Sequence, residues 1–296
     1  MELTKKSNGL QFHYYFNDDS HSINSIFRNE CEKEILLIIN EISETLGLEL
    51  EILTFPTEEG GFKEKWKLFG KNAPQITLIV AIALGVLSRY PVENKELTEL
   101  QIENLQLDNE LKRKELEKLN LDGVKDDSVI SPKEVSDSIN LVNKNYKISW
   151  RRSNLYKKLD SYPKVYQIDV TRLQDDEPVG SVRTVEKNDF SKFILRTDEL
   201  PSLRLERATI DVAAPAIKRK FRWKGFYNEV VINFLIEDFD FNNKVFSGQM
   251  RFSNHYSIEV EMTLERKINH DGNIVITNAV VHKVFAAVEG ENRIDY

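Results

Sequence analysis

Apolar and polar positions follow two different periods along the first sixty residues. Residues 10–16 are aromatic and β-prone, which predicts a strand. Over residues 23–46, apolar side chains recur every three or four positions with charged side chains between them, which predicts an amphipathic helix ending at Gly47. Residues 48–52 alternate between apolar side chains and glutamate, as in a short strand. Residues 1–61 are therefore expected to form a small α+β domain.

The next segment, residues 62–91, is predicted to contain an amphipathic helix over 62–70 followed by an uncharged helix over 72–88. The 17 residues between Lys71 and Arg89 carry no charge. A bilayer-spanning helix needs about 20 apolar residues, with roughly 17 as the lower limit, so we expect a short transmembrane helix. A helix buried in a protein core is the alternative. A third possibility is a segment that enters the membrane only on activation of an oligomer.

Residues 92–131 are predicted to form a charged helical connector followed by a linker. The stretch 92–121 lacks Gly and Pro and carries leucines in a heptad-like stripe, with a second apolar stripe beside it. Two apolar stripes on one helix are typical of a helix bundle, so a homo-oligomer is expected. Gly123 and the Ser131-Pro132 pair indicate the linker.

Residues 132–296 are predicted to form a β-rich ligand-binding domain that begins with a polar helix ending near residue 158. The Asp271-Gly272 pair is typical of a β-hairpin turn, and the spacing of the strands predicts an antiparallel barrel or curled sheet. The expected fold class is α+β: a small N-terminal α+β domain, one short transmembrane helix, a long charged helix and a C-terminal antiparallel barrel-like domain. The strands are expected at 179–186, 191–197, 204–212, 219–227, 230–237, 244–252, 256–267 and 273–285.

Charge and cysteine content add information on compartment. The net charge is −7, yet residues 132–296 carry 26 Lys/Arg against 24 Asp/Glu, so positive charge is concentrated there. The single cysteine, Cys31, cannot form an intrachain disulfide, which favours a reducing compartment. The N-terminus has no apolar stretch typical of a secretory signal. We expect a single-pass membrane protein. Its orientation stays open. The lysines before the span favour a cytoplasmic N-terminus, which would place the C-terminal domain on the other side of the membrane. The free thiol and the basic C-terminal domain instead favour a cytoplasmic location for that domain.

No motif indicates an enzyme. The chain contains no phosphate-binding glycine loop, no nucleophile elbow and no histidine or cysteine spacing typical of a metal site. The cluster at residues 18–22 contains acid, nucleophile and base types, but consecutive residues rarely converge on one point and helix capping explains them better. Neither a cofactor nor catalysis is expected.

Two stretches combine basic and aromatic residues. Residues 218–224 contain five Lys/Arg, and in a strand the side chains at 220, 222 and 224 would share one face opposite those at 221 and 223. The alternative is an amphipathic strand with a solvated basic face. The second stretch lies on the helix before residue 158 and also carries Trp150. Both suggest phosphate contacts and base stacking. The candidate ligand-binding residues are Arg151, Arg152, Lys157, Lys158, Lys220, Arg222, Trp223, Lys224, Phe226, Tyr227 and Arg251.

The layout of the chain resembles that of the channel-forming membrane effectors of the Hailong anti-phage defence system. The resemblance rests on Glu58-Glu59-Gly60-Gly61-Phe62 at the end of the N-terminal domain, the span at 72–88 and the strand pair around 220–252. It implies oligomeric pores in the bacterial inner membrane, an oligonucleotide ligand, no catalytic activity and a nucleotidyltransferase encoded alongside. The expected function is therefore an oligomeric channel-like effector gated by a nucleotide or short single-stranded DNA bound to the C-terminal domain. The alternative is a membrane-tethered adaptor that binds nucleic acid or protein without channel activity.

Overall fold

The chain divides into two compact units, Met1–Arg196 and Thr197–Tyr296. The computed structural model describes residues 7–18, 22–54, 62–89, 130–216, 218, 220–250, 256–289 and 292–296. The charged helix expected over 92–121 lies outside these residues. The sequence predicted a domain boundary at residue 132, whereas the division falls after Arg196 because the helices that follow residue 132 pack with the first unit.

The first unit contains a five-stranded antiparallel sheet with the order β2-β3-β1-β4-β5. Strand β1 lies between β3 and β4, so segments distant in sequence meet at the centre of the sheet. Alternate side chains of β1, among them Leu10 and Phe12, are fully buried, as expected of a strand with one covered face. The strands are β1 (Gly9–Phe16), β2 (Leu50–Thr54), β3 (Phe62–Gly70), β4 (Val165–Gln174) and β5 (Glu177–Glu186).

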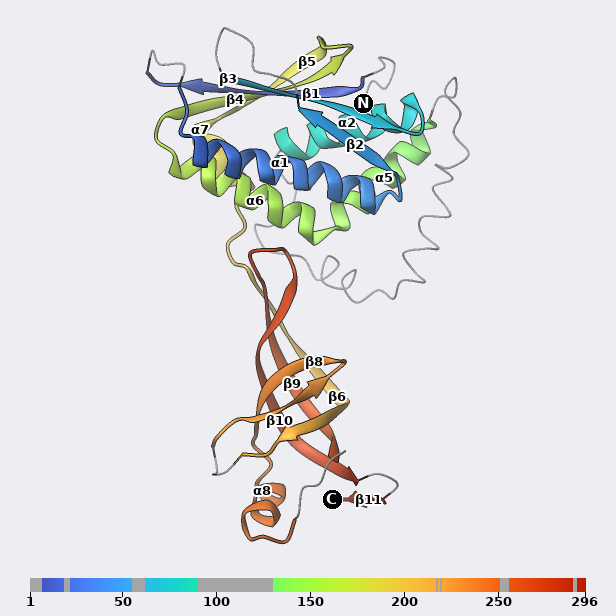
Figure 1. Cartoon of the computed structure of the whole chain (residues 1–296), viewed down its shortest axis with the longest axis vertical. Coiled ribbons are helices and arrows are strands. Elements are labelled where there is room, and N and C mark those ends of the chain that lie inside the picture. Colours follow the sequence, from blue (N-terminus) through green and yellow to red (C-terminus); the bar gives the residue numbers. More distant parts are fainter. Residues whose placement is uncertain are drawn as a thin grey trace. The chain divides into compact units, whose positions relative to one another are not determined.

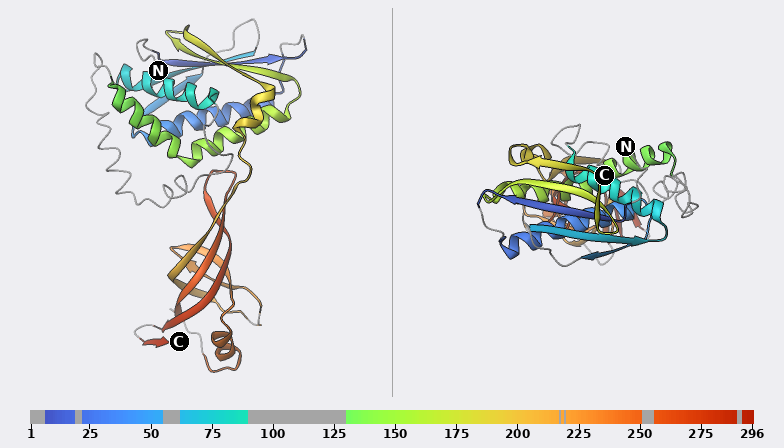
Figure 2. Two further views of the ribbon diagram at one scale, coloured as in Figure 1. Left: turned by 180° about the vertical axis from the view of Figure 1, so that it is seen from behind. Right: turned by 90° about the horizontal axis from the view of Figure 1, so that it is seen from above.

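Helices cover one face of this sheet, as seen from the front in Figure 1 and from behind in Figure 2. Helix α1 begins after Asn24, whose side-chain oxygen accepts hydrogen bonds from the backbone N–H groups of Ile26 and Phe27. Asn24, rather than the polar residues around position 20, is therefore the N-cap. The helices are α1 (Ser25–Thr45), α2 (Ala73–Ser88), α5 (Pro132–Lys144), α6 (Tyr146–Ser161), α7 (Lys187–Phe190) and the 3₁₀ turn η2 (Ser191–Phe193).

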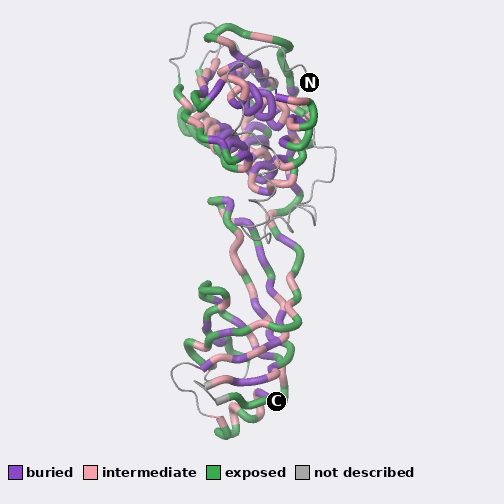
Figure 3. The backbone as a smooth tube through the Cα atoms, turned by 90° about the vertical axis from the view of Figure 1, so that its right-hand side faces the viewer, coloured by how far each residue is buried: buried purple, intermediate pink, exposed green. Residues whose placement is uncertain are grey.

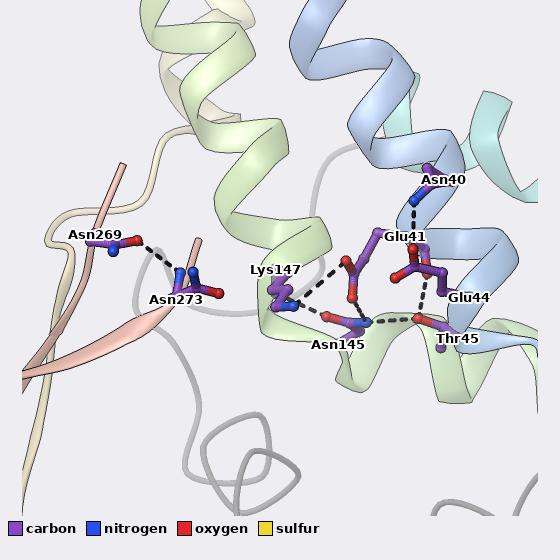
Figure 4. A network of polar contacts seen from close by, with 8 residues as sticks. All are labelled: Asn40, Glu41, Glu44, Thr45, Asn145, Lys147, Asn269 and Asn273. Carbon is purple, nitrogen blue, oxygen red and sulfur yellow. Dashed lines mark hydrogen bonds and ion pairs between the residues drawn. The ribbon is translucent and has the colours of Figure 1, made fainter. Parts of the chain in front are cut away.

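The single polar helix expected over about 133–158 is two helices separated at Asn145. The side chain of Asn145 accepts a bond from the backbone N–H of Lys147 and donates to Glu41 and Thr45 on α1, at 2.8 and 2.7 Å (Figure 4). One residue therefore ends α5, caps α6 and fixes their junction to α1.

The amphipathic helix expected over 62–70 is wrong, because these residues form strand β3. Glu64, Trp66 and Leu68 are buried, while Lys65 and Lys67 between them are only half-buried. This alternation has the period of two that is typical of a strand. The sequence favoured a helix here because three lysines beside an apolar segment resemble the flank of a membrane span.

Helix α2 contains the apolar segment for which a transmembrane span was expected. It has 16 residues, of which ten are buried, and it contributes Leu78, Val80 and Leu87 to the core shared with α1 and the sheet. None of the helices in the described part of the chain combines the length and apolarity needed to cross a membrane. The transmembrane helix is therefore unsupported, and α2 occupies the place that the core-helix alternative predicted.

The second unit is a closed five-stranded barrel with one short extra strand, which confirms the barrel-like C-terminal domain. The sheet order is β11-β10-β8-β7-β6-β9, and an additional pairing of β10 with β9 closes the ring. Strands β8 and β10 are parallel, and every other neighbouring pair is antiparallel. The elements are β6 (Glu199–Ala214), β7 (Trp223–Tyr227), β8 (Val230–Ile236), α8 (Phe239–Phe246), β9 (Tyr256–Ile268), β10 (Ile274–Glu289) and β11 (Asn292–Asp295).

Numbered one to five, the barrel strands β6, β7, β8, β9 and β10 close in the order 1-2-3-5-4, with a helix between the third and the fourth. This connectivity is that of the OB-fold, a five-stranded Greek-key barrel. Buried positions alternate with less buried ones along β9 (Figure 3). Trp223 and Phe234 lie at the centre of the core, and the ring of Phe241 from α8 lies 6.1 Å from that of Trp223.

Two of the expected strands are wrong because local apolar spacing favours helical turns. Residues 191–197 were expected to be extended, but α7 and η2 place Phe190 and Phe193, three positions apart, in the core, where Phe193 stacks on Tyr156. A strand was also expected over 244–252, but its first residues belong to helix α8. The Asp238 side chain caps this helix, and Phe241 and Val245, four positions apart, pack on the barrel core.

Candidate nucleic-acid interface

Strand β7 separates its side chains between the barrel core and the outer surface. Trp223 is 1% exposed, whereas Lys224 is exposed and Phe226 is 42% exposed. Between them, Gly225 is required by close packing, because a Cβ there would lie 2.6 Å from the backbone oxygen of Asp211. The strand thus places one basic and one aromatic side chain side by side on the outer face.

The connection from β6 to β7 carries most of the basic cluster. In residues 197–296, five of the 13 Lys/Arg lie within 218–224, a stretch without an acidic residue. The backbone N–H of Phe221 donates to the Lys218 carbonyl at 3.2 Å, and Lys220 has φ +66°, a conformation uncommon for residues other than glycine. The Phe221 side chain is 61% exposed. The loop therefore presents positive charge and an aromatic ring to the surface.

Arg222 connects this loop to two further strands. Its Nη1 donates to Asn278 Oδ1 on β10 at 2.7 Å and to the Asn233 carbonyl on β8 at 3.3 Å. A guanidinium has five N–H donors in a fixed plane, and these two bonds use Nη1 alone. The side chain is thereby oriented while its other nitrogens keep the capacity to contact a phosphate.

The outer face continues from β7 onto β8. Lys224 pairs with Asn233 across the ladder and Phe226 pairs with Val231, which is 50% exposed. The two strands are joined by Asn228 and Glu229, both with positive φ, as in a tight two-residue hairpin. The result is a surface with apolar and aromatic side chains at the hairpin end and basic side chains at the other.

Two aromatic candidates from the sequence belong to the core. Trp223 is buried between β8 and α8, and Tyr227 packs against the same core cluster from the inner side of β7. The Trp223 ring is therefore not exposed to a ligand in this arrangement, and Tyr227 is half-buried. Phe221, which the alternation had placed beside Trp223 on the inner face, is exposed because the strand starts only at Trp223. Arg251 lies outside the described residues.

The second basic cluster, on α6, is in the other unit and serves packing. Arg151 is buried, lies over the Trp150 ring at 4.7 Å and pairs with Glu34 of α1 at 3.4 Å. Burial raises the pKa of the Glu34 carboxyl, although Arg151 acts in the opposite direction. Burial lowers the pKa of the Arg152 guanidinium, whose Nε is shielded from solvent.

The α6 lysines Lys157 and Lys158 keep part of their surface exposed. Lys158 lies 3.5 Å from the Glu30 carboxylate, and Lys157 next to it is half-buried. Arg151 and Lys158 are thus paired with acidic side chains of α1, which the sequence distance between the two helices had concealed. The sequence also gave no signal for Asn233 and Asn278, the two partners of Arg222.

Groups that could hold a metal ion, with three or more His, Cys, Asp or Glu side chains together, are absent from the residues that the structure describes. In comparisons with known proteins, no family model, curated protein or solved structure matches the chain. The surface formed by Lys218, Lys220, Phe221, Arg222, Lys224, Phe226, Val231 and Asn233, hereafter the β7–β8 face, is therefore interpreted from its own chemistry.

Proposed function

We propose that the chain is a binding protein whose C-terminal barrel takes a nucleotide or a short single-stranded oligonucleotide on the β7–β8 face. The observation that carries the proposal is the joint exposure of Arg222, Lys224 and Phe226 on one face of the barrel. Cationic side chains neutralise phosphates, and an exposed ring stacks on a base without regard to its identity.

The strand order of the barrel supports the same location. In OB-folds, the face of the second and third strands and the loop between the first and the second bind oligonucleotides and oligosaccharides. Here β7 and β8 are the second and third strands, and the loop after β6 carries the basic cluster. The positive charge of residues 218–224 favours a phosphate-bearing ligand over a neutral sugar. Fold analogy alone would not assign a function, so the exposed side chains carry the argument.

The proposal takes the adaptor alternative for the rest of the chain. A channel built from residues 72–88 would require α2 to leave the core, where ten of its 16 residues are buried. Apolar burial stabilises by about 25 cal/mol per Å², so this exit would cost a large part of the stability of the first unit. A channel also requires the chain to permeabilise vesicles. Ion-flux measurements with liposomes would favour the channel if the purified chain gave a flux that the ligand controls.

A pair of charge-matched variants tests the binding face. The variant Arg222→Gln/Lys224→Gln removes two charges from the β7–β8 face, and Arg207→Gln/Lys267→Gln removes two from exposed positions on β6 and β9. Fluorescence anisotropy with a labelled oligo-dT of about ten nucleotides gives the affinity. We expect at least about tenfold weaker binding for the first variant and little change for the second. Equal affinities would contradict the proposed face.

Salt titration separates specific contacts from general attraction. For single strands the slope of log K against log salt changes by about 0.7 per phosphate contact, so Arg222→Gln/Lys224→Gln is expected to lower it by about 1.4. Phe226→Leu keeps the apolar character and removes the ring. It should weaken binding by roughly 1–3 kcal/mol and leave the salt slope unchanged.

A further inference from the structure

The sheet of the first unit has one face that none of the described helices covers (Figure 1). Since Glu64, Trp66 and Leu68 of β3 point into the core, the residues that precede each of them point to the opposite face. These are Lys63, Lys65 and Lys67. Alternate residues of a strand lie roughly 6.6–6.8 Å apart, so the three lysines form an evenly spaced line of residues along β3.

Strand β1 places polar and aromatic side chains beside this line. Its register sets His13 opposite Lys63 and Gln11 opposite Lys65. Two residues beyond His13, Tyr15 brings its ring centroid to 4.1 Å from that of His13. Burial and the neighbouring Lys63 both lower the pKa of His13, which favours a neutral imidazole. The line of positive charge is thus bordered by a pair of uncharged rings.

The central carboxylate on this face is already engaged. Asp169 of β4 accepts hydrogen bonds from the Tyr15 hydroxyl at 2.8 Å, from Thr184 at 2.6 Å and from Gln167 at 3.2 Å. These three donors stabilise its charge and orient the Tyr15 ring. Asp176 lies 3.8 Å from Lys67 at one end of the line. Within β3 the charged side chains on this face are all lysines. The acidic side chains Asp169, Asp176 and Glu51 lie on β4, on the turn after it and on β2.

We propose that this face, formed by Lys63, Lys65 and Lys67 with His13 and Tyr15, is a second binding surface, specific for the backbone and bases of single-stranded nucleic acid. Regularly spaced cations match a chain of phosphates, and rings beside them provide stacking surfaces. A sheet with helices on one face and aromatic and basic side chains on the other is also how the four-stranded RRM module holds single-stranded RNA. This site lies in the first unit and does not depend on the barrel.

Among anionic partners, the rings and the amide of Gln11 favour a nucleic acid over an acidic peptide or an anionic membrane. A membrane surface is recognised by exposed apolar side chains beside basic ones. On this face, exposed Leu53 of β2 lies opposite Lys67, and exposed Phe69 follows Lys67 on β3. These apolar side chains lie at one end of the lysine line, whereas His13 and Tyr15 lie beside its other end. Binding to lipid vesicles in place of oligonucleotides would therefore show that this face is a membrane-binding surface.

The test uses the full chain and two triple variants of equal charge. Lys63→Gln/Lys65→Gln/Lys67→Gln removes the line, and Lys33→Gln/Lys133→Gln/Lys192→Gln removes three charges from helical surfaces of the same unit. Anisotropy with labelled oligo-dT and oligo-U of about twenty nucleotides is recorded in a background carrying Arg222→Gln/Lys224→Gln, so that the barrel face contributes little. We expect the first triple alone to lower the salt slope by about 2.

Substitutions of Tyr15 keep the proposal testable should the lysine variant fold poorly. Tyr15→Phe retains the ring, whereas Tyr15→Leu removes it, so only the leucine variant is expected to lose affinity, by about tenfold. Ultraviolet cross-linking to the oligonucleotide should map to peptides containing residues 9–16 or 62–70. Equal binding by both triples, or cross-links confined to the barrel, would overturn the proposal. A loss seen only with phosphatidylserine vesicles, and not with oligonucleotides, would overturn it in favour of a membrane surface.

Discussion

Two stretches with the same basic and aromatic character have opposite environments in this protein. On α6, Arg151 is buried and paired with Glu34, whereas on β7 the Lys224 side chain is exposed beside an exposed Phe226. The difference arises from what packs against each element. Helix α1 brings glutamates to α6, while no described element covers the outer side of β7. Composition identified both stretches, but only the tertiary partner distinguishes a packing cluster from a ligand surface.

The largest expected difference is in stability, between variants of two aromatic residues within β7. Trp223→Ala removes a fully buried ring and should lower the free energy of unfolding of the second unit by about 3–5 kcal/mol. Phe226→Ala, three positions along on the outer face, should change it by no more than about 0.5 kcal/mol. Both changes in the free energy of unfolding can be measured from the urea dependence of hydrogen exchange in β9 and β10. Similar losses for the two variants would show that the assignment of inner and outer faces is wrong.

The buried carboxylate of Glu64, in the first unit, makes the stability of that unit depend on pH. Its side chain is fully buried on β3, where the Arg28 guanidinium lies at 2.8 Å and the Tyr14 hydroxyl donates at 3.2 Å. Burial, together with the nearby Glu32, raises the pKa of Glu64 from 4.5 to about 7 despite these partners.

Because the folded state holds the Glu64 proton more tightly, stability contributed by this group is present below pH 4.5 and is lost as the pH rises to about 7. The loss amounts to about 3 kcal/mol. Glu64→Gln should flatten the pH dependence of unfolding of the first unit over this range. Glu261→Gln, on β9 of the second unit, is the control and should leave the pH dependence of the first unit unchanged. A wild-type pH profile in Glu64→Gln would contradict the raised pKa.

Arg151 and Arg222 form the most closely matched pair of cations. Arg151→Met leaves the buried Glu34 without its guanidinium and should destabilise the first unit by about 2–3 kcal/mol, with no effect on oligonucleotide affinity. Arg222→Met should do the reverse, weakening binding with a change in stability of about 0.5 kcal/mol or less. Chemical denaturation and anisotropy on the same two proteins provide the measurement. Weaker binding by Arg151→Met would place α6 in the ligand site after all.

Local periodicity accounts for the elements that the sequence predicted correctly. The strand near residue 12, the helix over 23–46 and most barrel strands follow from alternation or three-to-four spacing. Local periodicity did not suffice to predict β3, where lysines adjoining an apolar segment resemble a membrane flank. It also did not suffice to place α2. A helix buried on most sides has the same uniform apolarity as a short membrane span, so only its neighbours α1 and β4 distinguish the two.

The candidate site shows the same limit. Exposure of Lys224 and Phe226 follows from strand alternation, but the alternation predicted for Phe221 failed because β7 begins two residues later. Strand alternation placed Trp223 opposite the basic side chains, where it is buried, yet its aromatic character also made it a ligand candidate. The contacts of Arg222 with β8 and β10 depend on barrel closure, a long-range pairing with no local signature.

Hydrogen exchange of the full chain with and without a short single-stranded oligonucleotide tests the central claim most directly. If the β7–β8 face is the ligand surface of the barrel, backbone amides of β7, β8 and the loop before them gain protection, while those of α6 do not change. Protection confined to α6, or absent from β7 and β8 at saturating oligonucleotide, would contradict it.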